Sequence, residues 1–136
     1  MKLTPESRIA GLSKPIGEEL LRVHPNYQPA LAALPAGVIK GLAHITGGGL
    51  LDNLPRVLPS HCDAIIDTGS WRVPALFTIL QENGGVEPSE MYQVFNMGIG
   101  MAVIVAEKDA AQMSRQLRAR RIGSIDSGKG IVQLVS

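Results

Sequence analysis

Three consecutive glycines, Gly47–Gly49, separate two stretches of different periodicity, and this junction constrains the fold more than any other feature. Residues 38–46 alternate in the manner of a β-strand, whereas apolar residues recur at helical spacing over residues 50–58. Glycine adopts positive φ freely and leaves the backbone N–H groups unscreened by side chains. The sequence therefore predicts a strand, a bare turn and a helix start in immediate succession.

Such a junction is a candidate anion site, because the first amides of a helix are unpaired and lie at its positive end. A phosphate or a carboxylate is stabilised there. The run has neither the Lys-Ser/Thr of a Walker loop nor the spaced glycines of a dinucleotide fingerprint. A tight strand-to-helix turn that binds nothing explains the glycines equally well, so both interpretations remain open.

Polar residues around the glycines are the next candidates. Strand alternation places His44 and Thr46 on one face, toward the mouth of the turn. His44 is expected to be either a hydrogen-bonded structural residue or a donor to a ligand, ahead of an acid–base role. Pro55 predicts a break in the helix near Leu54. Asn53 either caps the second helical turn or reaches the anion.

Residues 99–105 form the most continuous apolar run, which predicts a central strand covered on both faces. Gly98 and Gly100 at its start indicate that another backbone or a ligand comes close. Asn96 stands at the mouth of this strand, where it either orients a ligand or satisfies a turn.

The other elements follow from periodicity and turn residues. We expect a short segment at 17–22 with Leu20 and Leu21 buried, helices at 28–34, after Pro74, after Pro88 and at 108–118, a strand at 62–67, and a hairpin of 122–125 with 131–135. This order predicts an α+β fold: a layered α/β sandwich in which helices pack on a mixed sheet of four to five strands.

Composition bounds the class of protein. The 136 residues are the size of one domain, with residues 1–15 predicted as a linker or lead-in and 16–136 as the domain. A net charge of +1 argues against nucleic-acid and membrane partners. The single cysteine, Cys62, excludes an internal disulfide and suits a reducing, cytoplasmic setting. Scattered Asp and Glu residues predict no metal site.

Two runs, Ala43–Pro59 and Phe95–Met101, resemble the C-terminal half of phosphoribosylformylglycinamidine cyclo-ligase, also called aminoimidazole ribonucleotide synthetase. The resemblance extends from about Ile16 to Val135, and the family's N-terminal half has no counterpart here. It implies a partly ferredoxin-like topology in which this half forms one wall of the active site. Val23–Tyr27 departs from the family pattern, because the arginine that usually precedes the tyrosine is missing.

The resemblance implies a function in purine biosynthesis: ATP-dependent closure of formylglycinamidine ribonucleotide to aminoimidazole ribonucleotide. Its ATP and magnesium bind mainly to the N-terminal half, which is the implied partner, and the full-length enzyme is a possible homodimer. The resemblance assigns binding of a phosphorylated ribonucleotide to six residues, Gly47, Gly48, Gly49, His44, Thr46 and Asn96, and identifies no catalytic residue.

The chain alone is expected to be inactive and to need no cofactor, because phosphoryl transfer requires carboxylates that hold a metal ion. Two alternatives remain: a stand-alone module that binds a phosphorylated metabolite, and a docking half without a ligand.

Overall fold

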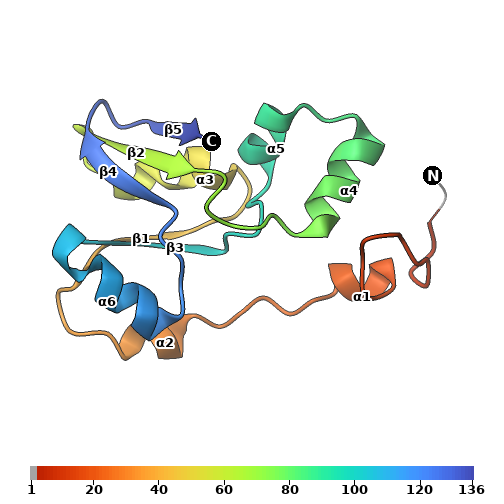
Figure 1. The fold of residues 1–136 in the computed structure, drawn as a ribbon, viewed down its shortest axis with the longest axis horizontal. Coiled ribbons are helices and arrows are strands. Elements are labelled where there is room, and N and C mark those ends of the chain that lie inside the picture. The colour runs from red at the N-terminus through yellow and green to blue at the C-terminus, as the bar shows by residue number, and fades with distance from the viewer. Residues whose placement is uncertain (1–2) are drawn as a thin grey trace.

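The computed structural model describes residues 3–136, and within this range the chain is α+β, as predicted (Figure 1). In chain order the elements are α1 (Ile16–Leu20), α2 (Gln28–Ala32), β1 (Ile39–His44), α3 (Gly49–Asn53), the 3-10 turn η1 (Pro55–Val57), β2 (Cys62–Asp67), α4 (Ala75–Gly84), α5 (Pro88–Val94), β3 (Met101–Val105), α6 (Glu107–Leu117), β4 (Gly123–Ser127) and β5 (Val132–Val135).

The strands divide between two sheets, which corrects the expectation of a single mixed sheet. β1 pairs with β3 in an antiparallel two-stranded sheet, and the second sheet has the order β4-β2-β5. β2 is antiparallel to β4 and parallel to β5. Because β4 and β5 occupy both edges of β2, neither β1 nor β3 can join it. The predicted sandwich character holds, since helices pack on these sheets.

The predicted hairpin of residues 122–125 and 131–135 is wrong, because β2 lies between β4 and β5. The loop between β4 and β5 is bound instead to Asp63 of β2, which is buried. Its carboxylate accepts hydrogen bonds from the backbone N–H groups of Lys129 at 2.7 Å and Ile131 at 3.0 Å, and from Nε2 of Gln133 at 3.0 Å. The connecting loop therefore closes around a side chain of β2, and its strands are held on opposite sides of that strand.

These bonds make stability depend on pH. The backbone N–H groups of Ile131 and Lys129 are the main cause that holds the pKa of Asp63 below its ordinary value of 3.8, while partial desolvation opposes them. The ionised carboxylate thus contributes stability above the unfolded-state pKa, and this contribution is lost as the pH falls through the folded-state pKa. We therefore expect the free energy of unfolding, measured with urea, to fall more steeply with decreasing pH in the native chain than in Asp63→Asn. Glu82→Gln, which removes an exposed carboxylate, serves as the control. The same pH dependence in Asp63→Asn as in the native chain would contradict this account.

The apolar run at 99–105 forms β3 from Met101 onward, but the prediction of a central strand is wrong. Within residues 3–136, β3 pairs only with β1, and Ala102 is its one buried residue. A close approach occurs at both glycines, but side chains make it, and not another backbone or a ligand as predicted. A Cβ at Gly98 would meet the Pro74 ring, and one at Gly100 would overlap the hydroxyl of Tyr27.

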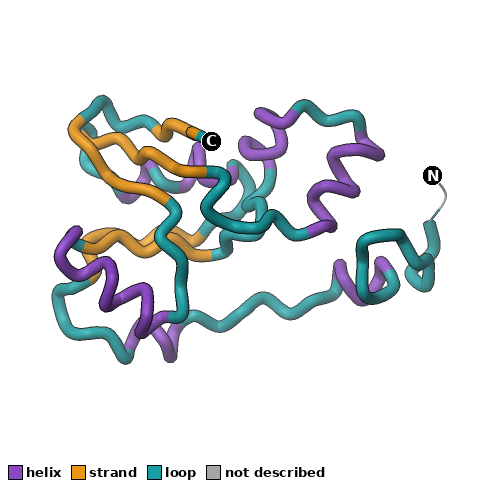
Figure 2. The backbone as a smooth tube through the Cα atoms, viewed as in Figure 1, coloured by secondary structure: helices purple, strands orange, loops and turns teal. Residues whose placement is uncertain are grey.

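The core lies where the glycine junction meets both sheets. In Figure 1 the β1–β3 sheet lies between the β4-β2-β5 sheet and the pair α2 and α6, and Figure 2 shows the strands gathered at one end of the molecule. Trp71 is buried in the core, and its Nε1–H donates to the carbonyl of Met97 at 3.0 Å. The buried cluster comprises Ala43, Ile45, Leu50, Leu54, Ala64, Ile66, Trp71, Met91, Met97 and Ala102.

The N-terminal part lies apart from this core. Figure 1 shows α1 at the far end of an extended segment that leads to α2. The prediction that Leu20 and Leu21 are buried is wrong, since they are 62% and 83% exposed, and Val23 beside them is 93% exposed. The single turn of α1 buries only Ile16. None of the helices in residues 3–136 has the length and apolar character needed to cross a membrane.

Candidate functional site

The predicted strand–glycine–helix junction is present. β1 ends at His44; Gly48, with a φ of +94°, immediately precedes α3, and Gly49, with a φ of +57°, is its first residue. Since α3 spans only five residues, its dipole is small, and any anion affinity must come from the turn amides themselves. The break that Pro55 predicts is also confirmed, because the 3-10 turn η1 follows α3 directly.

Asn53 organises the turn from inside the protein. Its Nδ2 donates to the carbonyls of Gly49 at 2.7 Å and Gly47 at 3.2 Å, and its Oδ1 accepts the hydroxyl of Thr46 at 3.4 Å. In a trans peptide the C=O and the following N–H point in opposite directions. The N–H groups of Gly48 and Leu50 therefore point away from Asn53. Neither predicted role of Asn53, second-turn cap or direct ligand contact, describes this arrangement.

The turn is open on one side and closed on the other. Gly47 is exposed, and no atom lies within 4 Å of the position that its Cβ would occupy. Gly49, in contrast, is buried against the backbone carbonyls of Tyr92 and Phe95. A carboxylate lies close by, because Oδ2 of Asp52 is 2.7 Å from a Cβ built on Gly48. An anion at this turn must bind beside that negative charge.

The two runs that carry the resemblance lie side by side. β1 and β3 pair along their length, with His44 opposite Met101, and the N–H of Ile45 donates to the carbonyl of Gly100 at 3.0 Å. Asn96 is the residue after Phe95, whose backbone carbonyl packs on Gly49. Its Oδ1 accepts the N–H of Gly98 at 2.9 Å, which is the turn that the sequence allows.

His44 and Thr46 are both exposed, and they alternate with the buried residues Ala43 and Ile45 as the strand pattern predicts. Their side chains have different partners. The hydroxyl of Thr46 donates a hydrogen bond to Oδ1 of Asn53, whereas Nε2 of His44 lies 3.0 Å from Nε2 of His24. The six predicted residues thus form two neighbouring groups, one at the glycine turn and one around His44.

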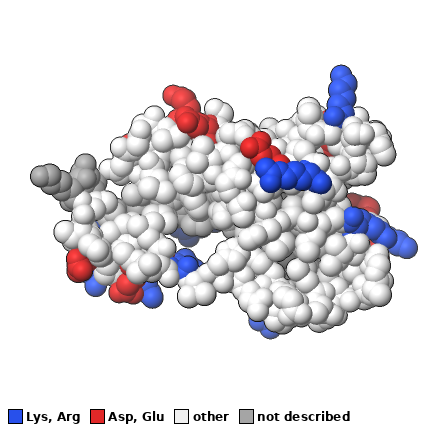
Figure 3. Space-filling model, turned by 180° about the vertical axis from the view of Figure 1, so that it is seen from behind, with Lys and Arg blue, Asp and Glu red and all other residues white. Residues whose placement is uncertain are grey.

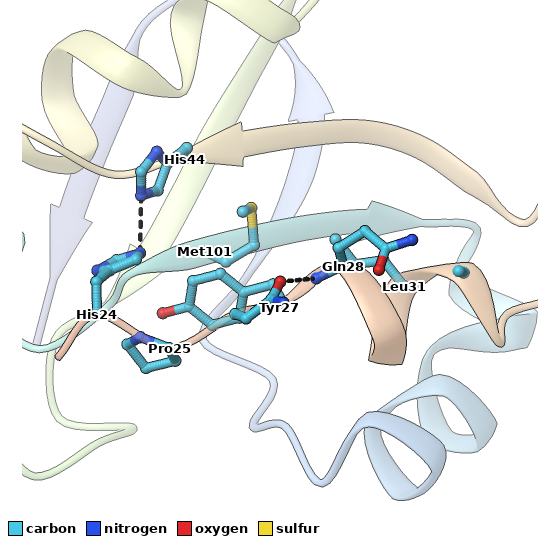
Figure 4. A pocket seen from close by; sticks show the side chains of 9 residues that line it. His24, Pro25, Tyr27, Gln28, Leu31, His44 and Met101 are labelled. Carbon is cyan, nitrogen blue, oxygen red and sulfur yellow. Dashed lines mark hydrogen bonds between the residues drawn. The ribbon is translucent and has the colours of Figure 1, made fainter.

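His44 lines an open pocket of about 420 Å³ between the segment before α2 and the β1–β3 sheet (Figure 4). The His24 ring contacts Tyr27 edge-on, with ring centroids 5.4 Å apart. Sequence reasoning missed His24 and Tyr27 as site residues, although Gly100 signalled a close approach and Tyr27 makes it. The lining residues are His24, Pro25, Asn26, Tyr27, Gln28, Leu31, Ala32, His44 and Met101.

Charge gives no further guide to a ligand. On the face shown in Figure 3, Lys and Arg side chains are scattered and partly mixed with acidic ones. Residues 3–136 contain no group of three or more His, Cys, Asp or Glu side chains placed to hold one metal ion. The structure thus places the glycine turn at the end of β1 and the imidazoles of His24 and His44 at the neighbouring pocket.

Comparison with known proteins identifies the family. Residues 3–135 match the family model described as AIR synthase related protein, C-terminal domain. Curated relatives named phosphoribosylformylglycinamidine cyclo-ligase include those of Syntrophus aciditrophicus, 43% identical over 99% of this chain, and Bacillus licheniformis, 42% identical over 96%. The relative from Bacillus thuringiensis is 46% identical over 91%.

The chain spans 41%, 39% and 38% of the lengths of these three relatives. The matched residues include the glycine turn, the His44 pocket and all five strands. The chain therefore belongs to the AIR synthase related protein, C-terminal domain family.

Proposed function

We propose that this chain is the substrate-phosphate-binding half of an ATP-dependent cyclo-ligase that closes formylglycinamidine ribonucleotide to aminoimidazole ribonucleotide in purine biosynthesis. The relatives' shared name supports the reaction class. The observation that carries the binding role is the Asn53 anchor, which binds the Gly47 and Gly49 carbonyls, so that the N–H groups of Gly48 and Leu50 point away from Asn53. Backbone amides of this kind form anion-binding concavities.

The proposal assigns a role to each group. Gly47, Gly48 and Gly49 form the turn that holds the phosphate, and Thr46 and Asn96 line it. The N–H of Gly49 already donates to the carbonyl of Thr46 at 3.1 Å, so the phosphate is proposed to bind to other N–H groups of the turn, such as that of Gly48. His44 contacts the ligand further along β1. ATP and magnesium belong to the part of the enzyme that corresponds to the remaining length of the relatives, so this chain alone is proposed to be inactive. The proposed setting is the cytoplasm, which the single cysteine suits.

Inorganic phosphate provides the direct test. In ¹H–¹⁵N spectra, we expect millimolar phosphate to shift the amides of Gly47–Leu51. Gly47→Val should weaken this binding by about tenfold or more, which corresponds to about 1.4 kcal/mol. The reason is that its side chain enters the open space over the turn without meeting any atom of the fold. Chemical-shift titration of both proteins measures the effect.

Val38→Ala is the control, because it shortens a half-buried side chain at the start of the β1 region and leaves the turn unchanged. Amides that stay unmoved in the native chain, or an affinity that survives Gly47→Val, would overturn the phosphate role.

A docking half without a ligand is the second candidate, and the exposed apolar residues Leu20, Leu21 and Val23 favour it. Large apolar side chains exposed together often mark a protein interface. The same titration separates the two candidates, because a docking half leaves the glycine amides unmoved.

A further inference from the structure

We propose that His24 and His44 bind a divalent transition-metal ion of the Cu²⁺, Ni²⁺ and Zn²⁺ group. The site shares His44 with the proposed ribonucleotide contacts and does not involve the glycine turn. The two Nε2 atoms are 3.0 Å apart. The ring centroids are 4.9 Å apart, and the ring planes are inclined by 59°. Figure 4 shows the two rings facing each other across the end of the pocket.

This spacing suits two ligands of one ion. Metal–imidazole bonds are about 2.0–2.1 Å long, so two of them at right-angled to tetrahedral geometry place their nitrogens about 2.9–3.4 Å apart. The observed distance falls within this interval. Without metal, one Nε2–H donates to the lone pair of the other Nε2. A metal ion takes a lone pair from each Nε2, so the ring that carried Nε2–H changes to its Nδ1–H tautomer by proton exchange with water, and both imidazoles stay neutral.

The surroundings leave room for the ion. Both histidines are exposed, so an ion can reach them without opening the fold. Met101 lies directly opposite His44 in the strand pairing and lines the same pocket, which places a soft thioether near the imidazoles. Imidazole ligands suit copper, nickel and zinc ions. Water completes the coordination, so binding is weaker than in a closed structural zinc site with four protein ligands.

Metal binding would join two distant parts of the chain. His24 belongs to the extended segment before α2, and His44 ends β1 twenty residues later. An ion that binds only when both imidazoles meet stabilises the folded arrangement by a free energy that grows with the logarithm of its concentration relative to its Kd. The proposed metal therefore fastens the extended segment to the β1–β3 sheet.

Calorimetric titration of the tag-free chain with CuCl₂, NiCl₂ and ZnCl₂ tests this. We expect one ion per chain, with copper bound most tightly. His24→Ala and His44→Ala should each weaken binding by more than about tenfold, because each removes a direct ligand rather than a supporting group. The third histidine provides the matched control: His61 is exposed and precedes β2, so His61→Ala should retain the native affinity.

The native chain supplies a test that is independent of any variant. With diamagnetic Zn²⁺, long-range ¹H–¹⁵N spectra should shift the Nε2 resonances of His24 and His44 and leave those of His61 unchanged. Three results would each overturn the proposal: a metal affinity of His24→Ala equal to that of the native chain, zinc-induced shifts at His61 alone, or no binding at millimolar metal. A failure of phosphate binding at the glycine turn leaves it unaffected.

Discussion

Replacement of Gly49 by alanine is expected to lower the free energy of unfolding by about 3–5 kcal/mol. Gly49 has a φ of +57°, a left-handed conformation that disfavours side chains. A Cβ there would overlap the carbonyl oxygen of Tyr92 and lie 2.8 Å from that of Phe95. Both oxygens belong to the backbone at the end of α5, so relief requires the helix to move away from the core. Urea unfolding followed by circular dichroism measures the loss.

Gly85 separates the steric effect from the conformational one. Its φ is +60°, nearly that of Gly49, but no atom lies within 4 Å of its Cβ position. Gly85→Ala should therefore cost only the left-handed conformation, about 1–2 kcal/mol. Equal losses in the two variants would show that α5 does not press on the glycine turn.

Local patterns predicted the elements nearest the candidate site. The strand that became β1 alternates buried and exposed residues because one face packs on the core, and this alternation is visible in the sequence. The start of α3 and its break before Pro55 follow from glycine conformation and from the missing N–H of proline. Each of these features depends on neighbours within a few residues.

Sheet pairing was not predictable in the same way. The terminal segments carried a hairpin signal, but the Asp63 carboxylate, more than 60 residues earlier, captures their connecting loop. The apolar run of β3 indicated a central strand, but the central position belongs to β2, whose two edges pair with β4 and β5, and β3 pairs with β1 in the other sheet. Short-range periodicity says which residues are apolar, whereas pairing depends on contacts between residues far apart in the chain.

The candidate site shows the same division. Gly47–Gly49, His44, Thr46 and Asn96 were predicted as one group, and the roles assigned to them stay predictions. The structure adds Asn53 as the internal anchor and His24 as the partner of His44. No periodic pattern connects His24 with His44, because an extended segment without regular structure brings them together. In the sequence, only Gly100 indicated that another part of the chain comes close here, and in the structure Tyr27 and His24 lie near it.

A second large loss is expected for Gly128→Ala, about 3 kcal/mol in the free energy of unfolding. A Cβ at Gly128 would overlap the carboxyl group of Asp63. That carboxyl cannot swing aside freely, because the N–H groups of Lys129 and Ile131 hold it. The alanine must therefore displace the loop or break the bonds that separate β4 from β5. Urea unfolding of the variant and the native chain gives the difference.

Two comparisons establish that Asp63 causes this loss. Gly47→Ala also adds one Cβ to a glycine outside the left-handed region, but in open space, so it should change stability by less than about 0.5 kcal/mol. In an Asp63→Ala background the obstructing carboxyl is gone, and Gly128→Ala should then cost less than about 1 kcal/mol. Additive losses in this double-mutant cycle would mean that the loop does not close around Asp63. A strong coupling would instead make this single carboxylate the reason that the C-terminal strands lie on either side of β2.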